Sequence, residues 1–391
     1  MKKASYKAFF LASFCILILG CEKKISSDLI VFDVNMNVPV KTLNIEDIAD
    51  IDYLVLDISD DDYLYRYYYA MTDSFIICKE SNGFLFFSRT TGKPVSKVNR
   101  YGQGPGEYSS NVIVSEYSEI NNEFFILTDV GEISVYLRDG TFKRKFAVGE
   151  LPTSFFIRYM YDFDENHLLI YGHTLGEKNK KVMQDSSFML VSKQDGFANV
   201  ITIPVEEMIS TFFWFDKELS GYGAVADTYY AIRNGNDFLL TDYSSDTVYR
   251  FTPDRQLIPV LVRQPSIQKM ESKIFLHSWL ETEKYLFFST QLIEIDWIAS
   301  KWPDHKGFLM EKKSGRFFRT NVQMRDYRGK ELIINPSIVH KVSAHQTGII
   351  VLDVSELQEA NKENKLSGKL KEVTESLSKD DERVFMILKF K

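Results

Sequence analysis

The chain has 391 residues, of which 45% are hydrophobic and 14% aromatic, and its formal net charge is −7. This composition can fill a large β-rich core, and the acidic balance excludes a nucleic-acid ligand, which needs a basic surface. Only one cysteine, Cys78, lies beyond residue 21, which excludes a disulfide framework.

Residues 1–20 have the pattern of a secretory signal peptide: three lysines precede the apolar run Ala8–Leu19, which is too short to span a bilayer. The run ends in LILGC (residues 17–21), which resembles the lipobox of bacterial lipoproteins. The resemblance implies that Cys21 is lipidated and that the mature protein is an outer-membrane lipoprotein, held to the membrane through its lipid only. Whether it faces the periplasm or the exterior stays open. An ordinary signal peptide followed by a chance cysteine is the alternative.

The mature chain begins with a polar stretch, residues 21–50, which we interpret as a tether and lead-in. Removing residues 1–20 takes away three lysines and no acid, so the net charge falls from −7 to −10. From residue 51 onward, apolar strand-like runs alternate with polar turns. This predicts one all-β domain over residues 51–391.

The length of the repeating unit can be measured from the spacing of one turn that recurs in it. It recurs at Gly92, Gly140, Gly196, Asp254 and Gly315, with spacings of 48, 56, 58 and 61 residues. A four-stranded propeller blade takes about 40 to 45 residues, so each unit is interpreted as one blade with an insertion.

A sixth blade is expected from the apolar runs at 348–353 and 384–390. The last run should pair beside the strand at 53–58, because an open ring would leave bare sheet edges. The fold predicted is a six-bladed β-propeller.

The loop RYGQGPGEY (residues 100–108) lies between two strand-rich units. Its three glycines allow a sharply bent backbone, and no helix follows, which argues against a phosphate-binding loop. A structural junction between blades 1 and 2 is the favoured interpretation. Within it, Arg100, Gln103, Glu107 and Tyr108 are candidate ligand-binding residues.

These features resemble the six-bladed, NHL-like β-propeller lipoproteins of Gram-negative gut bacteria. The residues that carry the resemblance are the lipobox at Cys21, the loop at 100–108, DTVYRF at 246–251 and the terminal ILKFK. The family brings no settled biochemical activity to this chain.

Insertions are predicted to crowd one face of the disc. The segments 172–187, 289–307 and 354–383 are assigned to connections between the second and third strands of blades. The glycine loop, 204–228 and 263–283 are assigned to connections between blades. Residues 354–383 should be partly helical, since Leu366, Leu370, Val373 and Leu377 repeat at helical spacing. They form either a flap on this face or a solvated excursion.

No sequence motif of a known catalytic site is present, and neither a cofactor nor a metal is expected. Asp162, Asp164 and Asn166 alternate as in a calcium loop, but His167 and His173 stand where that loop needs a glycine and a glutamate. A turn before a strand accounts for them better.

Aromatic residues in the insertions suggest a ligand surface. Trp214, Trp297 and Trp302 lie in segments assigned to the elaborated face, where sugar rings could stack on them, although they could equally pack the loops onto the propeller. The function expected is a non-catalytic binding module for a glycan or a surface-protein partner. Catalytic residues are unknown.

The alternative function is a propeller enzyme, a lyase or hydrolase, with its site at the mouth of the axial channel. Arg100, Glu107, Tyr108 and His173 would be its first candidate residues. An assembly protein with a broad apolar patch is a third class.

Overall fold

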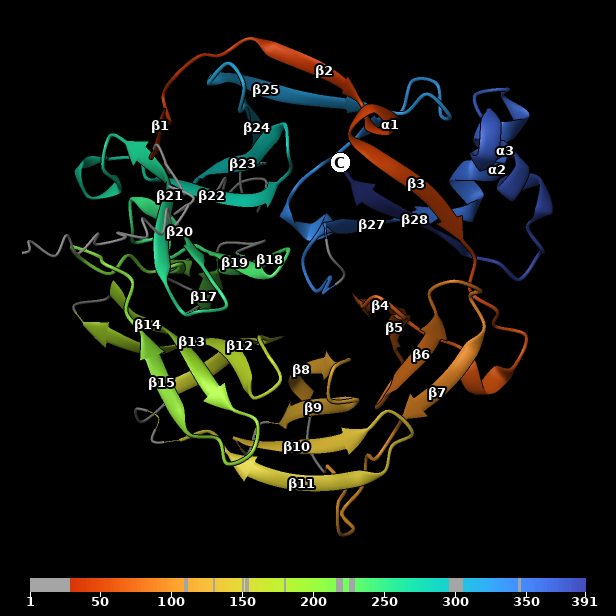
Figure 1. Cartoon of the computed structure of the whole chain (residues 1–391), viewed down its shortest axis with the longest axis horizontal. Coiled ribbons are helices and arrows are strands. Elements are labelled where there is room, and N and C mark those ends of the chain that lie inside the picture. Colours follow the sequence, from red (N-terminus) through yellow and green to blue (C-terminus); the bar gives the residue numbers. More distant parts are fainter. Residues whose placement is uncertain are drawn as a thin grey trace, which may run out of the picture.

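The computed structural model describes residues 29–108, 112–128, 131–149, 151, 155–178, 181–215, 221–224, 229–294, 305–343 and 346–391. Six antiparallel sheets stand around a central axis like the blades of a propeller, which confirms the predicted fold (Figure 1). In each sheet the innermost strand lies near the axis, and the outermost strand runs along the rim.

The first three blades have four strands each, listed from the axis outward. They are β4 to β7 (Tyr67–Met71, Phe75–Lys79, Phe84–Ser88, Pro94–Val98), β8 to β11 (Val112–Ser118, Glu123–Thr128, Glu132–Leu137, Phe142–Ala147) and β12 to β15 (Phe155–Asp162, His167–Lys178, Lys181–Ser192, Ala198–Ile201).

The other three blades draw on both ends of the chain. Blade 4 has β18 to β21 (Ala231–Asn234, Asp237–Leu240, Thr247–Phe251, Leu257–Gln264), and blade 5 has β22 to β25 (Ile274–Glu281, Tyr285–Leu292, Lys306–Glu311, Arg316–Gln323) with the short β26 (Glu331–Leu332). Blade 6 has β27 (Thr347–Asp353), β28 (Arg383–Phe390) and β3 (Ala49–Leu54).

The N-terminal segment closes the ring over three blades in succession. Strand β1 (Ile30–Asp33) lies parallel to β21, β2 (Val40–Asn44) lies parallel to β25, and β3 pairs antiparallel with β28. The last strand therefore pairs beside an N-terminal strand as predicted, with Met386 opposite Tyr53. Residues 30–33 and 40–44, within the stretch interpreted as a tether, instead cover blade edges, because the short apolar alternation around Phe32, which is fully buried, is enough to add an edge strand.

The hydrophobic core is divided among the spaces between neighbouring blades. Each of six clusters of buried side chains takes most of its residues from two adjacent blades. Between blades 1 and 2, for example, Phe84 and Phe124 meet edge to face at 4.6 Å. Because every blade packs between two neighbours, the middle strands, such as β5 and β9, are near-continuous apolar runs.

The turns used to count the blades also join them. Gly92, Gly140, Gly196 and Gly315 have φ between +66° and +83°, and in the fourth blade Arg255, next to Asp254, has φ +65°. A Cβ at Gly196 would lie 2.0 Å from the carbonyl oxygen of Ala147, at the end of the preceding blade's outer strand. A Cβ at Gly92 would likewise lie 2.1 Å from the carbonyl oxygen of Val55, so these two positions need glycine both for the turn and for a close neighbour, whereas at Gly315 only the turn requires it.

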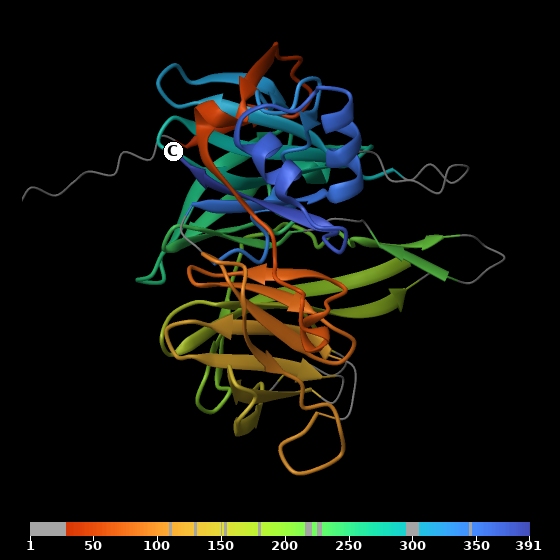
Figure 2. The ribbon, with the colours of Figure 1, turned by 90° about the vertical axis from the view of Figure 1, so that its right-hand side faces the viewer.

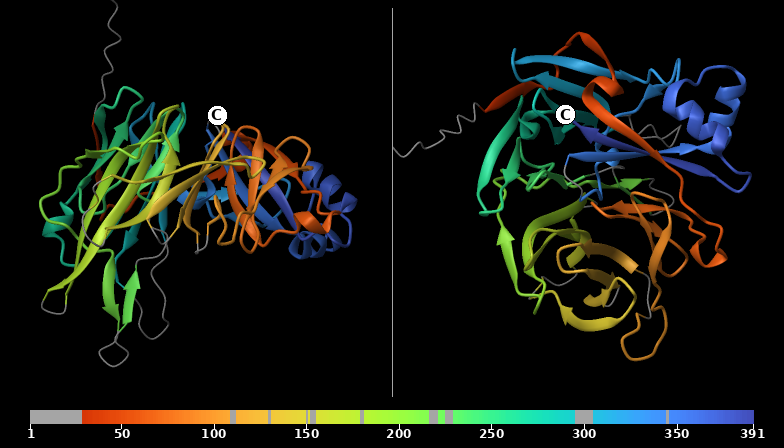
Figure 3. Two further views of the ribbon diagram at one scale, coloured as in Figure 1. Left: turned by 90° about the horizontal axis from the view of Figure 1, so that it is seen from below. Right: turned by 45° about the vertical axis from the view of Figure 1, so that its right-hand side comes forward.

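Insertions project mainly from one side of the disc, which Figures 2 and 3 show edge-on. There β13 and β14 extend as a long hairpin, and β16 (Phe212–Phe215) pairs with β17 (Gly221–Ala224) in a second one. Of the segment 263–283, expected as a loop, residues 274–281 form β22.

The segment 354–383 contains α2 (Val354–Lys362) and α3 (Gly368–Ser376). The two helices lie against blade 6 at the rim, where Leu357 and Leu370 are buried in the core between blades 5 and 6 (Figure 1). Short helices complete the list: α1 (Ile45–Ile48), η1 (Asp61–Tyr63), η2 (Ile267–Lys269) and η3 (Pro336–Ile338). Within the described residues, no helix is long and apolar enough to cross a membrane.

Candidate functional site

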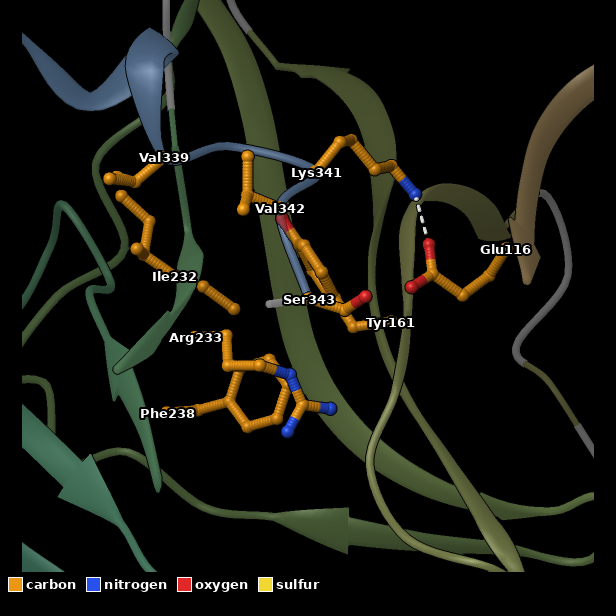
Figure 4. Close-up of a pocket in the computed structure, with 10 residues that line it drawn as sticks. Glu116, Tyr161, Ile232, Arg233, Phe238, Val339, Lys341, Val342 and Ser343 are labelled. Carbon is orange, nitrogen blue, oxygen red and sulfur yellow. Dashed lines mark hydrogen bonds and ion pairs between the residues drawn. The ribbon is translucent and has the colours of Figure 1, made fainter. Parts of the chain in front are cut away.

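Charged side chains from three blades meet at the axis of the propeller (Figure 4). Lys341 lies at the inner end of blade 6, in a segment that touches β4 through a single bridge between Met71 and Val342. Its ammonium group is 2.8 Å from Oε2 of Glu116 on β8, and it donates to the carbonyl oxygens of Ser115 (3.0 Å) and Met160 (2.8 Å). One side chain thus ties blade 6 to blades 2 and 3.

The ion pair between Lys341 and Glu116 is buried, with side-chain exposures of 8% and 10%. Burial lowers the pKa of Lys341, but the Glu116 carboxylate outweighs it and leaves the pKa above its ordinary value. Oε1 of Glu116 accepts a hydrogen bond from the backbone N–H of Asp162 at 3.2 Å. Both carboxylate oxygens are therefore engaged.

Two further cations stand beside this pair. The guanidinium of Arg233, on β18, donates to the carbonyl oxygen of Asp162 and lies over the ring of Phe238. Lys193, 3% exposed, is 2.6 Å from Oδ1 of Asp162. Asp162 therefore serves as the partner of a buried lysine, in agreement with a structural role for this turn.

The axial cluster leaves almost no room for a ligand. The cavity between Glu116, Arg233 and Lys341 has a volume of about 10 Å³, which admits one water molecule at most. Its charges hold one another and its donors reach backbone carbonyls, so the cluster acts as a connection between blades.

Histidine and tyrosine rings lie in contact near the axis, with His277 buried and His340, Tyr159 and Tyr229 half-buried. The ring of His340 lies 4.9 Å from that of Tyr229 and 5.4 Å from that of Tyr159. His277, on β22, has its Nε2 atom 3.2 Å from the hydroxyl of Ser289. Burial lowers the pKa of His340 to about 3 and places the pKa of His277 well below its ordinary value, so both rings are neutral at pH 7.

The residues proposed from the glycine loop lie at the rim instead of the channel mouth (Figure 1). Arg100 Nε donates to the carbonyl oxygen of Gly140 at 2.7 Å, and the hydroxyl of the buried Tyr108 donates to the carbonyl oxygen of Asn82. Glu107 accepts a hydrogen bond from the N–H of Gly104. These contacts fit the structural junction between blades 1 and 2. The loop follows the outer strand β7, and the contact of Arg100 with Gly140 holds it beside the outer turn of blade 2, before the chain turns inward to β8.

The structure does not bring the candidate enzyme residues together. Arg100, Glu107 and Tyr108 belong to the rim between blades 1 and 2, whereas His173 is buried in β13 beside Phe156. Gln103 lies in the same rim loop and is exposed.

The remaining sequence candidates fall where the structure gives no side chain. Trp214 lies in β16, of which the backbone alone is described, and Trp297, Trp302 and Cys21 lie outside the described residues. Sugar stacking on these tryptophans therefore stays a prediction.

The long hairpin offers an open strand edge on the elaborated face. β12 pairs with β13 up to Thr174, and β15 pairs with β14 from Phe188 onward. Beyond these points β13 and β14 continue together from Leu175 to Lys178, opposite Gln184 to Lys181. Among the described strands, none pairs with Leu175–Lys178 on the edge that faces away from β14.

Sequence reasoning missed the axial cluster and the open edge. Glu116 and Lys341 are 225 positions apart, and each stands alone in its segment. The one available signal was a charged residue inside VIVSEYS, an otherwise strand-like run.

One solved structure supports the fold. A "Putative exported protein" of Bacteroides fragilis has a TM-score of 0.60 and 15% identity, over 93% of this chain and 99% of that one. A member of the DUF4221 family from Bacteroides vulgatus gives a TM-score of 0.46 and 10% identity, over 88% and 97% of the two chains. No curated protein matches.

A protein-family comparison covers almost the whole described chain. Residues 29–389 match the family described as "Domain of unknown function (DUF4934)". The matched range begins just before β1 and ends within β28, so it contains all six blades and the three N-terminal edge strands. The chain therefore belongs to the DUF4934 family.

Proposed function

We propose that the protein is a lipid-anchored binding module that holds an extended segment of a protein partner against the hairpin β13–β14. The observation that carries the proposal is the edge of Leu175–Lys178, with which no strand in the described part of the chain pairs. A strand edge presents backbone N–H and C=O groups in a row, and a partner strand can add to it through main-chain hydrogen bonds. Native proteins usually shield such edges.

The position of this edge suits a partner of large size. The hairpin projects from the same side of the disc as β16–β17, away from the rim (Figures 2 and 3). Binding residues concentrate on such projections above a rigid scaffold. The filled axis supports binding over catalysis at the channel mouth, because its ionisable groups are held by one another.

Anchoring through Cys21 is part of the proposal. It is supported by the LILGC sequence at residues 17–21 and by the likeness to a Bacteroides fragilis protein named as exported. Metabolic labelling of cells with a fatty acid should mark the wild-type protein and leave Cys21→Ala unlabelled. Equal labelling of both proteins would remove lipidation at this residue.

Photo-crosslinking tests the partner-binding edge directly. Gly176 suits a photoreactive amino acid, because a Cβ there would meet no atom within 4 Å. We expect a discrete adduct when cells that carry this variant are irradiated, and none from the same group at Lys313, an exposed residue on the opposite face. Protease sensitivity of the added mass would identify a protein, whereas glycosidase sensitivity would favour the glycan alternative.

A variant with a shortened hairpin should fold normally but lose the partner. Leu175 pairs with Gln184, so Asn-Gly in place of residues 176–183 can close a two-residue turn without disturbing the ladder below. This variant should keep its melting temperature and lose a partner that the Gly176 adduct has identified. Undiminished binding to the shortened variant, or no adduct at Gly176, contradicts the proposal.

A further inference from the structure

A second recess lies on the face opposite the hairpins, between blades 2 and 3. Its volume is about 340 Å³, at the lower end of the range for small-molecule sites. Its walls come from the turn after β8, the turn after β12 and the turn after β14, together with the rim strand β11. We refer to it as the polar recess. Short turns between paired strands give it rigid walls.

The charged residues of the polar recess are fixed by one another. Arg144 binds Glu123 through two parallel contacts, at 2.7 Å and 2.8 Å, and Lys143 adds a third at 2.5 Å. Arg144 also donates to the carbonyl oxygen of Lys193 at 2.7 Å. Burial raises the pKa of Glu123, but Arg144 and Lys143 outweigh it, so the pKa lies below its ordinary value and the group is ionised.

The buried ammonium of Lys193 is also saturated. Besides Asp162, it donates to Oδ1 of Asn121 at 2.7 Å, to the carbonyl oxygen of Asp164 at 2.6 Å and to the hydroxyl of Ser118 at 3.0 Å. An ammonium has three hydrogens, and four acceptors surround this one. It therefore has no hydrogen left for an anionic ligand.

The amide of Asn121 is oriented by the same contacts. Its Oδ1 accepts from Lys193, and its Nδ2 donates to the carbonyl oxygen of Glu165 at 3.0 Å. This links the turn of blade 2 to the turn of blade 3. The gap between the two blades is thereby fixed at this point.

Three side chains of the recess face solvent and, unlike the ion-paired groups, have donors and acceptors to offer. Asn166, Gln194 and Glu165 are exposed, and their side chains make no hydrogen bond to the described part of the chain. The two amides each carry donors and acceptors, and the carboxylate adds acceptors. Such a set matches hydroxyl groups, which also donate and accept.

We propose that the polar recess is a second binding site and that it takes a neutral saccharide of one or two units. The paired cations disfavour an anion, and the free amides offer hydrogen bonds to a polyhydroxylated ring. This site lies on the face opposite the hairpin and is independent of the partner-binding proposal.

Ligand-observed NMR on the purified full-length protein in detergent tests the site, with calorimetry for affinity. The probes are neutral mono- and disaccharides, and glucuronate and glucosamine serve as charged controls. We expect saturation transfer to at least one neutral sugar. In Asn166→Ala/Gln194→Ala the dissociation constant should rise about tenfold, because each amide contributes hydrogen bonds of ordinary strength. Gln358→Ala, an exposed residue of α2, should bind as wild type does.

Three results would overturn the proposal. They are the absence of saturation transfer to every neutral sugar, an unchanged dissociation constant in the double variant, and tighter binding of glucuronate or glucosamine than of the neutral sugars. A folding defect does not obscure the outcome, because both substituted side chains are exposed and the melting temperature of each variant can be measured alongside.

Discussion

Lowering the pH from 8 to 5 should destabilise the protein by about 2 kcal/mol through His340 alone. Burial, and then the neighbouring Lys341 ammonium, bring the pKa of His340 to about 3, against 6.5 in the unfolded chain. Above pH 6.5 the ring is neutral in both states and contributes no pH dependence. Below 6.5 the unfolded state takes up a proton that the folded state refuses, so stability falls until the pH reaches about 3.

Two other histidines act in the same direction. Burial lowers the pKa of His173 to about 4 and places that of His277 well below its ordinary value. Urea unfolding at several pH values between 8 and 5 measures the loss of unfolding free energy caused by the three histidines together. Most carboxylates titrate below this pH range. His340→Phe keeps an aromatic ring among Tyr159, Tyr161 and Tyr229 and should remove about 2 kcal/mol of the dependence. An unchanged pH profile in this variant would exclude His340 as a source.

The blade count could be predicted because the chain repeats a local requirement. At Gly92, Gly140, Gly196 and Gly315 the turn needs positive φ, and these four turns mark the same point in blades 1, 2, 3 and 5. Ring closure followed from a general rule about sheet edges. The blade count follows from a local sequence signal, and ring closure follows from a rule that holds for any sheet, so neither prediction needs knowledge of distant contacts.

The position of the glycine loop could not be predicted in the same way. A connection between blades leaves from the outermost strand, and the direction of that strand depends on the accumulated twist of its sheet. In this protein β7 runs along the rim, so Arg100 meets Gly140 of the next blade far from the axis. The sequence indicated the bend of the loop but carried no information on its distance from the channel.

The pairing of β1 with blade 4 and of β2 with blade 5 was also not predicted. Each strand is only four or five residues long, and each lies parallel to a partner more than two hundred positions away. Such pairings are selected by the edges left open after the blades have formed. Local propensity says little about them.

The candidate sites could not be predicted for the same reason, because each combines residues from distant segments of the chain. The polar recess joins Glu123 and Arg144 of blade 2 to Lys193 of blade 3, and none of the three stood in a motif. The segment that carries the open edge of β13 was assigned to an insertion, residues 172–187, from its position in the chain alone. Its pairing could be known only after β12 and β15 had been placed.

Removing the carboxylate at the axis should have the largest effect of a single substitution. Glu116→Ala leaves the Lys341 ammonium buried without its counter-charge, and loss of one partner of a buried ion pair costs about 3 to 5 kcal/mol. The backbone N–H of Asp162 also loses its acceptor. Urea unfolding at pH 7 measures the loss. Asp62→Ala, which breaks an exposed contact with Lys97, is the matched control and should cost less than about 1 kcal/mol.

A double-substitution cycle separates the ion pair from the packing around it. Lys341→Met should also destabilise, since it leaves the Glu116 carboxylate without its counter-charge and removes one donor each from the carbonyl oxygens of Ser115 and Met160. In Glu116→Ala/Lys341→Met no charge is left uncompensated, so the combined cost should be smaller than the sum of the single costs by at least about 1 kcal/mol. Additive losses would mean that the two side chains act independently. A connection that ties blade 6 to blades 2 and 3 through one ammonium group requires coupling, because either substitution alone already breaks it.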